Sequence, residues 1–210
     1  MVKRSKSKKK QRSSRGYYKR SVGNRELRQR FLIVCEGKAT EKNYFEKFRV
    51  TRLEIIIKGL GCNPLNLVKG VQMIVDKGKK DDDQYHQVWC VFDRDEWLPE
   101  DFNSAIRMAE AQGWHVAYSN EAFELWYILH FEFLNTGLSR KNYSKKLTQY
   151  LGQPYEKNSH FMYDMLMEHQ NTAIANAERL LEEYEPPNPE KDNPSTTVHL
   201  LVKELNKHTV

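Results

Sequence analysis

Short apolar runs alternate with amphipathic stretches along the first two thirds of the chain. The runs are rich in β-branched and aromatic residues, which indicates strands that are buried on both faces. They lie at residues 31–35, 53–59, 87–92 and 115–119. Apolar residues at helical spacing mark the intervening stretches, at 40–48, 64–75 and 99–112. This alternation predicts an α/β fold with a parallel four-stranded sheet flanked by helices.

The pattern becomes helical in the last third of the chain. A helix with one apolar face is expected at 174–184, and the four prolines of 185–196 predict an extended connection. A start signal at 193–196 precedes a last amphipathic helix. We therefore expect residues 136–210 to form a helical C-terminal extension packed on an α/β core of residues 30–135.

The net charge of +6 is unevenly distributed along the chain. Residues 1–30 contain thirteen Lys and Arg and one acid, whereas the remaining 180 residues contain 21 basic and 27 acidic side chains. Because so few apolar residues cannot form a core, residues 1–29 are expected to be a disordered basic arm. The arm either serves solubility alone or binds nucleic-acid phosphate, and Tyr17 and Tyr18 add stacking groups that favour nucleic acid. The candidate phosphate contacts in the arm are Lys8, Lys9, Lys10, Arg12, Arg15, Lys19 and Arg20.

Cysteine and histidine spacing gives no sign of a zinc site or a disulfide framework. The three cysteines lie 27 and 28 residues apart, and the seven histidines form no ligand set on one element. Cys35 and Cys90 fall in predicted strands, where a thiol usually acts as a small apolar side chain. No apolar run approaches the roughly 20 residues that span a bilayer, so a cytoplasmic location is expected.

Acidic residues follow two of the predicted strands. Glu36 follows 31–35, and Asp93 and Asp95 follow 87–92. The functional crevice of a parallel sheet lies at the carboxyl ends of its strands. If the strand continues through Asp95, both aspartates point to one side, and their mutual repulsion is relieved by a cation such as Mg²⁺. Ordinary surface loops also carry such pairs, so this alternative stays open.

The residues after Glu36 suggest a site for phosphate. Gly37 allows a sharp turn and the close approach of a substrate. Lys38 and the N-terminus of the helix that starts near Thr40 would then be available to phosphate. Glu41 is a candidate supporting residue of such a site. The alternative is a plain turn with a solvated Glu36, in which Glu41 only complements the helix dipole.

The very apolar segment 119–132 contains a further candidate acid. Glu124 interrupts a predicted helix that begins where the fourth strand ends, which would place Glu124 near the same crevice. Glu121 is more simply an acid of the first helical turn, and His130 is better explained as a core histidine than as a general base. In the extension, a phosphate path and a solvated face both remain open for Lys141, Lys145 and Lys146.

Two levels of resemblance follow from these segments. An acid–glycine strand end, followed two crossovers later by an Asp-x-Asp strand end, resembles a Toprim domain, the fold of primases, type II and IA topoisomerases and OLD-type nucleases. Over residues 30–206 the chain more closely resembles the RloB-like family, which is associated with abortive infection and phage defence. Four segments carry this resemblance: "VCEGKATEKNYFEKF", "CVFDRDE", "SNEAFELWYILHFE" and "NPSTTVHLLVKEL".

The resemblance implies a nuclease site that depends on Mg²⁺ or Mn²⁺, and a partner ABC-type ATPase. The implied roles are metal ligand or general base for Glu36, metal ligands for Asp93 and Asp95, a further acid for Glu124, and a helper for Asn120. Where proline is expected after Ser-Asn, this chain has Glu121. This departure leaves open which of Glu121 and Glu124 faces the metal.

Together these features predict hydrolysis of phosphodiester bonds in DNA or RNA, including transfer RNA, with water as the nucleophile. The alternative is a non-catalytic module that binds nucleic acid through its arm and docks on a partner ATPase.

Overall fold

The structure is a computed structural model, and it describes residues 28–209 apart from residues 52, 82, 83 and 96. The candidate phosphate contacts of the arm, from Lys8 to Arg20, therefore lie outside the described residues.

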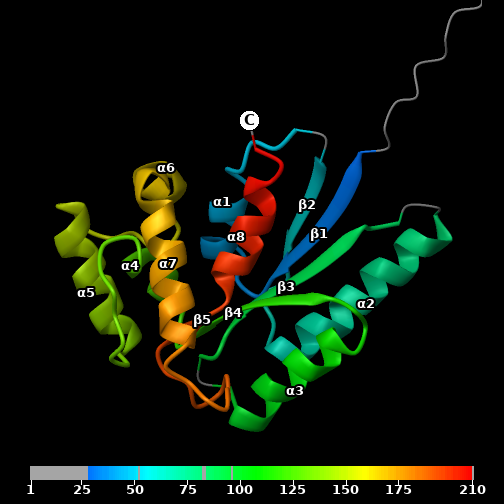
Figure 1. Cartoon of the computed structure of the whole chain (residues 1–210). Coiled ribbons are helices and arrows are strands. Elements are labelled where there is room, and N and C mark those ends of the chain that lie inside the picture. The colour runs from blue at the N-terminus through cyan, green and yellow to red at the C-terminus, as the bar shows by residue number, and fades with distance from the viewer. Residues whose placement is uncertain (1–27, 52, 82–83, 96, 210) are drawn as a thin grey trace, which may run out of the picture.

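One mixed sheet forms the centre of the molecule, with strand order β2-β1-β3-β4-β5 (Figure 1). The four parallel strands match the predicted ones closely, and they are β1 (Gln29–Cys35), β2 (Leu53–Gly59), β3 (Gln87–Asp93) and β4 (His115–Asn120). Because β1 and β3 are neighbours, Glu36 and Asp93 lie side by side at the carboxyl ends of these strands.

The prediction of an all-parallel, four-stranded sheet is wrong at one edge. A fifth strand, β5 (Ser195–Thr196), pairs antiparallel with β4. The hydroxyl of Thr196 donates a hydrogen bond to the Tyr118 carbonyl oxygen at 2.8 Å, and the Thr197 backbone N–H donates to the same oxygen at 2.9 Å. Ser195 and Thr196 were expected to start the last helix, but α8 (Val198–Asn206) begins after them. A strand of two residues is too short to produce a hydrophobic period.

Alternation along β1 explains why its sequence is apolar throughout. Phe31, Ile33 and Cys35 enter the core on one face of the sheet, and Leu32 and Val34 enter the core on the other. Two helices, α2 (Pro64–Lys80) and α3 (Pro99–Glu110), cover the second face (Figure 1). The α2 helix continues to Lys80, beyond the predicted helical stretch of 64–75.

The first face is covered by α1 and by the helices of the C-terminal half (Figure 1). These are α1 (Thr40–Phe45), α4 (Glu124–Ile128), α5 (Arg140–Leu151), α6 (Met162–Leu166), the 3₁₀ helix η1 (Met167–His169), α7 (Gln170–Leu181) and α8. A single apolar cluster contains residues of β1, α4, α5, α7 and α8. The predicted extension therefore shares its core with the predicted α/β unit.

The very apolar segment 119–132, in which a helix was predicted after the fourth strand, forms the end of β4, the short α4 and turns on either side of α4. Its aromatic residues are nevertheless buried, and His130 lies in the core with its Nδ1 2.8 Å from the Trp126 carbonyl oxygen. Among the described helices, none is both long and apolar enough to cross a membrane.

Candidate functional site

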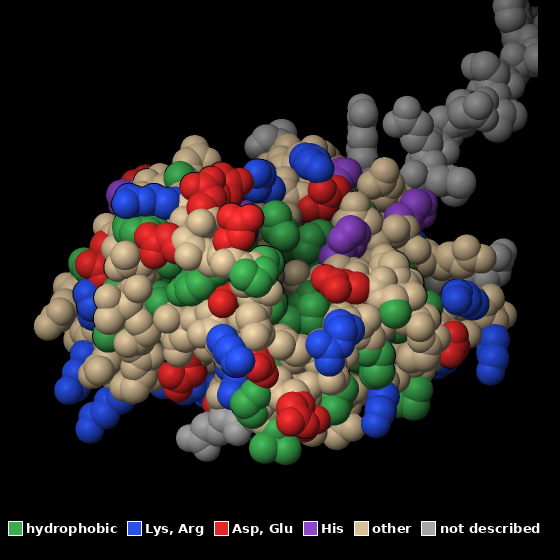
Figure 2. All heavy atoms as spheres, turned by 60° about the horizontal axis from the view of Figure 1, so that its bottom comes forward, with side chains coloured by type: hydrophobic (Ala, Val, Ile, Leu, Met, Phe, Trp, Pro, Cys, Tyr) green, Lys and Arg blue, Asp and Glu red, His purple; other side chains and the backbone are tan. Residues whose placement is uncertain are grey.

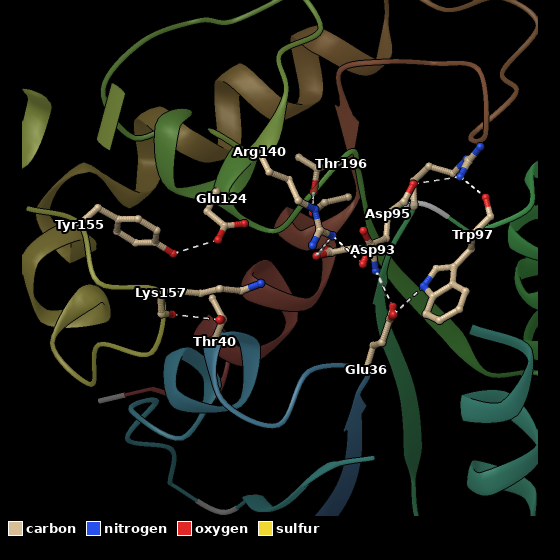
Figure 3. Close-up of polar contacts among 12 residues, drawn as sticks. Glu36, Thr40, Asp93, Asp95, Trp97, Glu124, Arg140, Tyr155, Lys157 and Thr196 are labelled. Carbon is tan, nitrogen blue, oxygen red and sulfur yellow. Dashed lines mark hydrogen bonds and ion pairs between the residues drawn. The ribbon is translucent and has the colours of Figure 1, made fainter. Parts of the chain in front are cut away.

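Four carboxylates from separate elements meet at the carboxyl ends of the strands, and we call them the acidic cluster. Glu36 follows β1, Glu41 lies in α1, Asp93 ends β3 and Glu124 begins α4. The charges of Glu41, Glu124 and Glu36 all act on Asp93, and Figure 3 shows Glu36, Asp93 and Glu124 around one region. The structure thus brings together Glu36, Asp93 and Glu124, which the sequence predicts near one crevice, and Glu41, for which the sequence left two interpretations open.

The Glu36 carboxylate is held by two donors. The Asp93 backbone N–H donates to Oε2 at 3.1 Å, and the Trp97 indole N–H donates to Oε1 at 2.8 Å (Figure 3). Burial raises the pKa of Glu36 to about 7, although both hydrogen bonds act in the opposite direction. A carboxyl group with such a pKa can exchange a proton near neutral pH.

Glycine at position 37 makes room for Glu41. A Cβ atom at Gly37 would collide with the Glu41 carboxylate, and one at Gly59 would approach the Gly37 carbonyl oxygen to 2.5 Å. The β1–α1 turn therefore packs tightly between the end of β2 and the acidic cluster. Lys38 is exposed and lies against Gly61, on the β2 side of the turn.

Asp93 and Glu41 each have a buried oxygen whose hydrogen bonding is unsatisfied. Their residues are 9% and 5% exposed, and neither Asp93 Oδ1 nor Glu41 Oε2 has a hydrogen-bond partner in the described part of the chain. Burial, followed by the charges of Glu41 and Glu124, raises the pKa of Asp93 well above its usual value. Burial and Glu124 also raise the pKa of Glu41. Such buried, unpaired carboxylate oxygens are costly and call for a partner.

Asp95 reaches the site by a turn and not by strand alternation. The strand ends at Asp93, and Asp95 has a positive φ of 46°, which aspartate tolerates better than most residues. The Arg94 guanidinium donates to the carbonyl oxygens of Asp95 and Trp97 and so closes the turn. The condition that the strand continues through Asp95 is therefore not met, although both aspartates face the same cation, Arg140.

Arg140 is a site residue that sequence reasoning missed. Its Nη2 lies 2.9 Å from Asp95 Oδ2 and 3.8 Å from Asp93 Oδ2. The basic stretch at the start of α5 was the available signal, but it pointed to other residues. In the structure Lys141 and Lys145 are exposed, and Lys146 pairs with Glu132.

The segment between α5 and α6 also reaches the site, from more than 100 residues away from α1. Thr40 Oγ1 donates to the Lys157 carbonyl oxygen at 2.9 Å, and Asn43 donates to the Asn158 carbonyl oxygen at 3.0 Å. The Tyr155 hydroxyl donates to Glu124 Oε1 at 3.1 Å, and the Lys157 side chain points towards the acidic cluster (Figure 3). No local sequence pattern predicts these contacts, because they depend on how the extension packs against α1 and α4.

Asn120 and Glu121 have different surroundings from the acidic cluster. Asn120 Nδ2 donates to the carbonyl oxygens of Pro189 and Glu190, so it ties the end of β4 to the extended connection. The Glu121 carbonyl oxygen accepts from the Asp95 backbone N–H at 3.1 Å, and the Asn120–Glu121 peptide bond is cis. Of the two acids left open by the sequence, Glu124 is the one buried among the carboxylates.

A divalent cation would need side-chain movements to bind here. In the residues that the structure describes, no three His, Cys, Asp or Glu side chains are already arranged as a metal-binding group. Arg140 supplies positive charge to Asp93 and Asp95 instead. The cluster offers only carboxylate oxygens, which are the ligands that magnesium and manganese prefer.

The raised pKa of Glu36 has a measurable effect on stability. Glu36 titrates near 4.5 when unfolded and near 7 when folded. Between these values the unfolded chain has lost a proton that the folded protein keeps, so the free energy of unfolding falls as pH rises. Glu36→Gln cannot ionise, so its loss of stability between about pH 5 and about pH 8 should be smaller by on the order of 2 kcal/mol.

Urea unfolding of the metal-free protein at the two pH values measures this difference. The matched control is Glu110→Gln, which changes an exposed acid at the end of α3. An equal pH dependence in Glu36→Gln and the parent would show that Glu36 ionises normally.

Comparison with known proteins gives one match. The family model described as RloB-like protein matches residues 31–205, which is most of the chain and includes all the acids described above. No curated protein and no solved structure matches the chain. The chain belongs to the RloB-like protein family.

Proposed function

We propose that this protein is a metal-dependent nuclease with a Toprim-type site, and that it acts in an abortive-infection or anti-phage system. The observation that carries the proposal is the pair of buried, unpartnered carboxylate oxygens, Asp93 Oδ1 and Glu41 Oε2. They belong to a cluster at the carboxyl ends of β1 and β3, the two neighbouring strands that bear the acid–glycine and Asp-x-Asp segments. This placement supports the Toprim resemblance.

The donor set fits Mg²⁺ or Mn²⁺. Asp93 and Glu41 each present an oxygen that lacks a hydrogen-bond donor among the described residues. Besides burial, the charges of Glu41, Glu124 and Glu36 raise the pKa of Asp93, and that of Glu124 raises the pKa of Glu41. A hard divalent cation removes that repulsion and takes a few carboxylate ligands together with water and phosphate oxygens. Asp93 and Glu41 would hold the ion, with Asp95 joining them if Arg140 moves away.

The protein's own groups then supply proton transfer and positioning. Glu36, fixed by Trp97 and by the Asp93 backbone N–H, would accept a proton from the attacking water. Tyr155 orients Glu124 at the opposite side of the cluster. A bound divalent cation would polarise the phosphodiester and stabilise the leaving oxygen. Tyr44, which is 1% exposed in the core, is not placed to act as a nucleophile.

Nucleic acid is expected to bind mainly through the basic arm. Acidic and basic side chains are interspersed on the face shown in Figure 2, which brings the lower side of Figure 1 forward. Such a surface gives weak attraction for a polyanion, whereas the arm of residues 1–29 contains twelve Lys and Arg. The proposed substrates are DNA or RNA, including transfer RNA. The family resemblance further implies a partner ABC-type ATPase.

One observation favours the alternative of a non-catalytic module that binds nucleic acid and docks on an ATPase. Arg140 already neutralises part of the charge of Asp93 and Asp95. If that ion pair is permanent, the cluster is structural and no metal enters.

Cleavage assays separate the two functions. The protein, alone and co-expressed with the ABC-type ATPase expected as its partner, is incubated with single- and double-stranded DNA, RNA and transfer RNA in Mg²⁺, Mn²⁺ or EDTA. We expect new ends on at least one substrate with Mg²⁺ or Mn²⁺ and none in EDTA. Equal cleavage by Glu36→Gln and the parent would refute the role of Glu36, and no cleavage in any combination would favour the non-catalytic module.

A further inference from the structure

Arg140 brings the positive charge of α5 into the site. It is the first residue of that helix, and its side chain is 34% exposed. Figure 3 shows the guanidinium reaching in beside Asp93 from the side of the extension. Arg140 therefore lies where it can contact both the acids and a molecule that enters from solvent.

The guanidinium is incompletely paired in this position. Both ion pairs come from one nitrogen, Nη2, and the 3.8 Å separation from Asp93 Oδ2 exceeds a hydrogen-bond length. Arg140 Nε is buried and has no hydrogen-bond partner within the described ranges. An arginine side chain presents a planar fork that best matches two oxygens of one carboxylate or phosphate. The contacts in the structure do not use this fork.

The balance of charges at the site also indicates that Arg140 can contact a phosphate. The acidic cluster and Asp95 supply five carboxylates, and the charges of Arg140 and Lys157, both in the extension, act on this group. A phosphate that approached would be repelled unless a cation faced it. A divalent ion at Asp93 would replace the charge of Arg140 there and leave the guanidinium available to a phosphate oxygen.

We propose that Arg140 occupies the place of the cation between Asp93 and Asp95 in the resting protein and contacts the substrate phosphate once a divalent ion has bound. This inference rests on the proposed function, because it assigns a phosphodiester to the same site. It makes Arg140 a competitor of the metal and a ligand of the phosphate. Removing the guanidinium must then strengthen the binding of the metal ion and weaken the binding of the phosphate.

The test uses the full chain with Arg140→Gln. The matched control is Arg107→Gln, which changes an exposed arginine in the last turn of α3 whose guanidinium donates to the Ser104 hydroxyl. Isothermal titration with Mn²⁺ alone measures metal affinity. Fluorescence anisotropy with a labelled tetranucleotide measures phosphate binding at saturating Mn²⁺, in a Glu36→Gln background. The short probe limits the contribution of the arm.

We expect Arg140→Gln to bind Mn²⁺ about 10-fold more tightly, because a positive charge next to the ion is removed. We expect it to bind the tetranucleotide about 10-fold more weakly, because a charge-assisted hydrogen bond to phosphate is lost. Arg107→Gln should change neither. Unchanged or weaker Mn²⁺ binding by Arg140→Gln would overturn the inference, and so would unchanged tetranucleotide binding.

A second variant, Arg140→Lys, separates the proposed role of the guanidinium from an effect of misfolding. Arg140→Lys keeps the charge but loses the fork, so Mn²⁺ affinity should stay near that of the parent while tetranucleotide binding falls severalfold. Equal tetranucleotide binding by Arg140→Lys and the parent contradicts a role for the fork. Both readouts are independent of turnover. Opposite changes in a protein that cleaves nothing would therefore support the role of Arg140 and refute the nuclease.

Discussion

Asp93→Asn should lower metal-dependent cleavage by at least about 100-fold. Even the mutation of residues that only support metal ligands usually lowers metal affinity or activity by about 10–100-fold. Asp93→Asn should also remove the increase in melting temperature that Mg²⁺ or Mn²⁺ gives to the parent. Both effects follow because Asp93 Oδ1 is the buried oxygen at the centre of the acidic cluster, without a hydrogen-bond partner in the described chain. An amide at this position cannot supply the lost charge.

The same substitution should stabilise the metal-free protein. Asp93 is repelled by Glu41, Glu124 and Glu36, and burial adds to the cost of its charge. Arg140 loses only its longer contact, because it keeps the 2.9 Å pair with Asp95. Relief of about 1 kcal/mol would raise the melting temperature by about 2–4 °C in a protein of this size. Gain of stability with loss of function is typical of acids held together for a ligand.

Melting curves with and without Mn²⁺, together with cleavage rates, measure both effects. The control is Asp76→Asn, which changes an exposed acid on α2 whose carboxylate accepts a hydrogen bond from Gln72. The assignment of Asp93 would be refuted if Asp93→Asn kept either the Mn²⁺-dependent increase in melting temperature or the cleavage rate of the parent.

Gly37→Ala should damage the site more than the fold. The new methyl group would collide with the buried carboxylate of Glu41, a residue of α1, so this carboxylate must turn away from its place in the acidic cluster. That helix is tied to the extension through Thr40 and Asn43. We therefore expect Mn²⁺ affinity and cleavage to fall by about 10–100-fold, the range for groups that support metal ligands. The chain should still fold.

Two further variants separate steric damage from general strain. Gly113→Ala places a side chain at a φ of 73° with no atom close to the new Cβ, so it should lower stability and leave Mn²⁺ binding unchanged. Gly37→Ala combined with Glu41→Ala removes the collision and should recover stability but not Mn²⁺ affinity. If Gly37→Ala alone binds Mn²⁺ like the parent, Glu41 is not part of the metal site.

Position at the end of a buried strand was a strong guide to the site. Glu36 and Asp93 were predicted together because β1 and β3 are apolar throughout and parallel, so their carboxyl ends meet at one edge. Glu41 remained ambiguous in the sequence, because an acid in a first helical turn is common without any ligand. Only its burial, at 5% exposure, and its contact with Gly37 distinguish it.

Residues that arrive through tertiary packing could not be predicted. Arg140 lies 47 positions after Asp93 in the sequence, and its neighbours Lys141 and Lys145 carry the same charge without reaching the acids. Tyr155 contacts Glu124 only because its segment packs on α1. Asp95 was assigned correctly to the edge but for the wrong reason, since a turn presents it and not the strand.

Crystals grown with Mn²⁺ and measured for anomalous scattering test the central claim most directly. The expected result is a manganese peak about 2.1 Å from Asp93 Oδ1, with the Glu41 carboxylate turned towards it and Arg140 withdrawn from Asp93. A structure at saturating Mn²⁺ with no peak at the acidic cluster, and with Arg140 still between Asp93 and Asp95, would contradict the account.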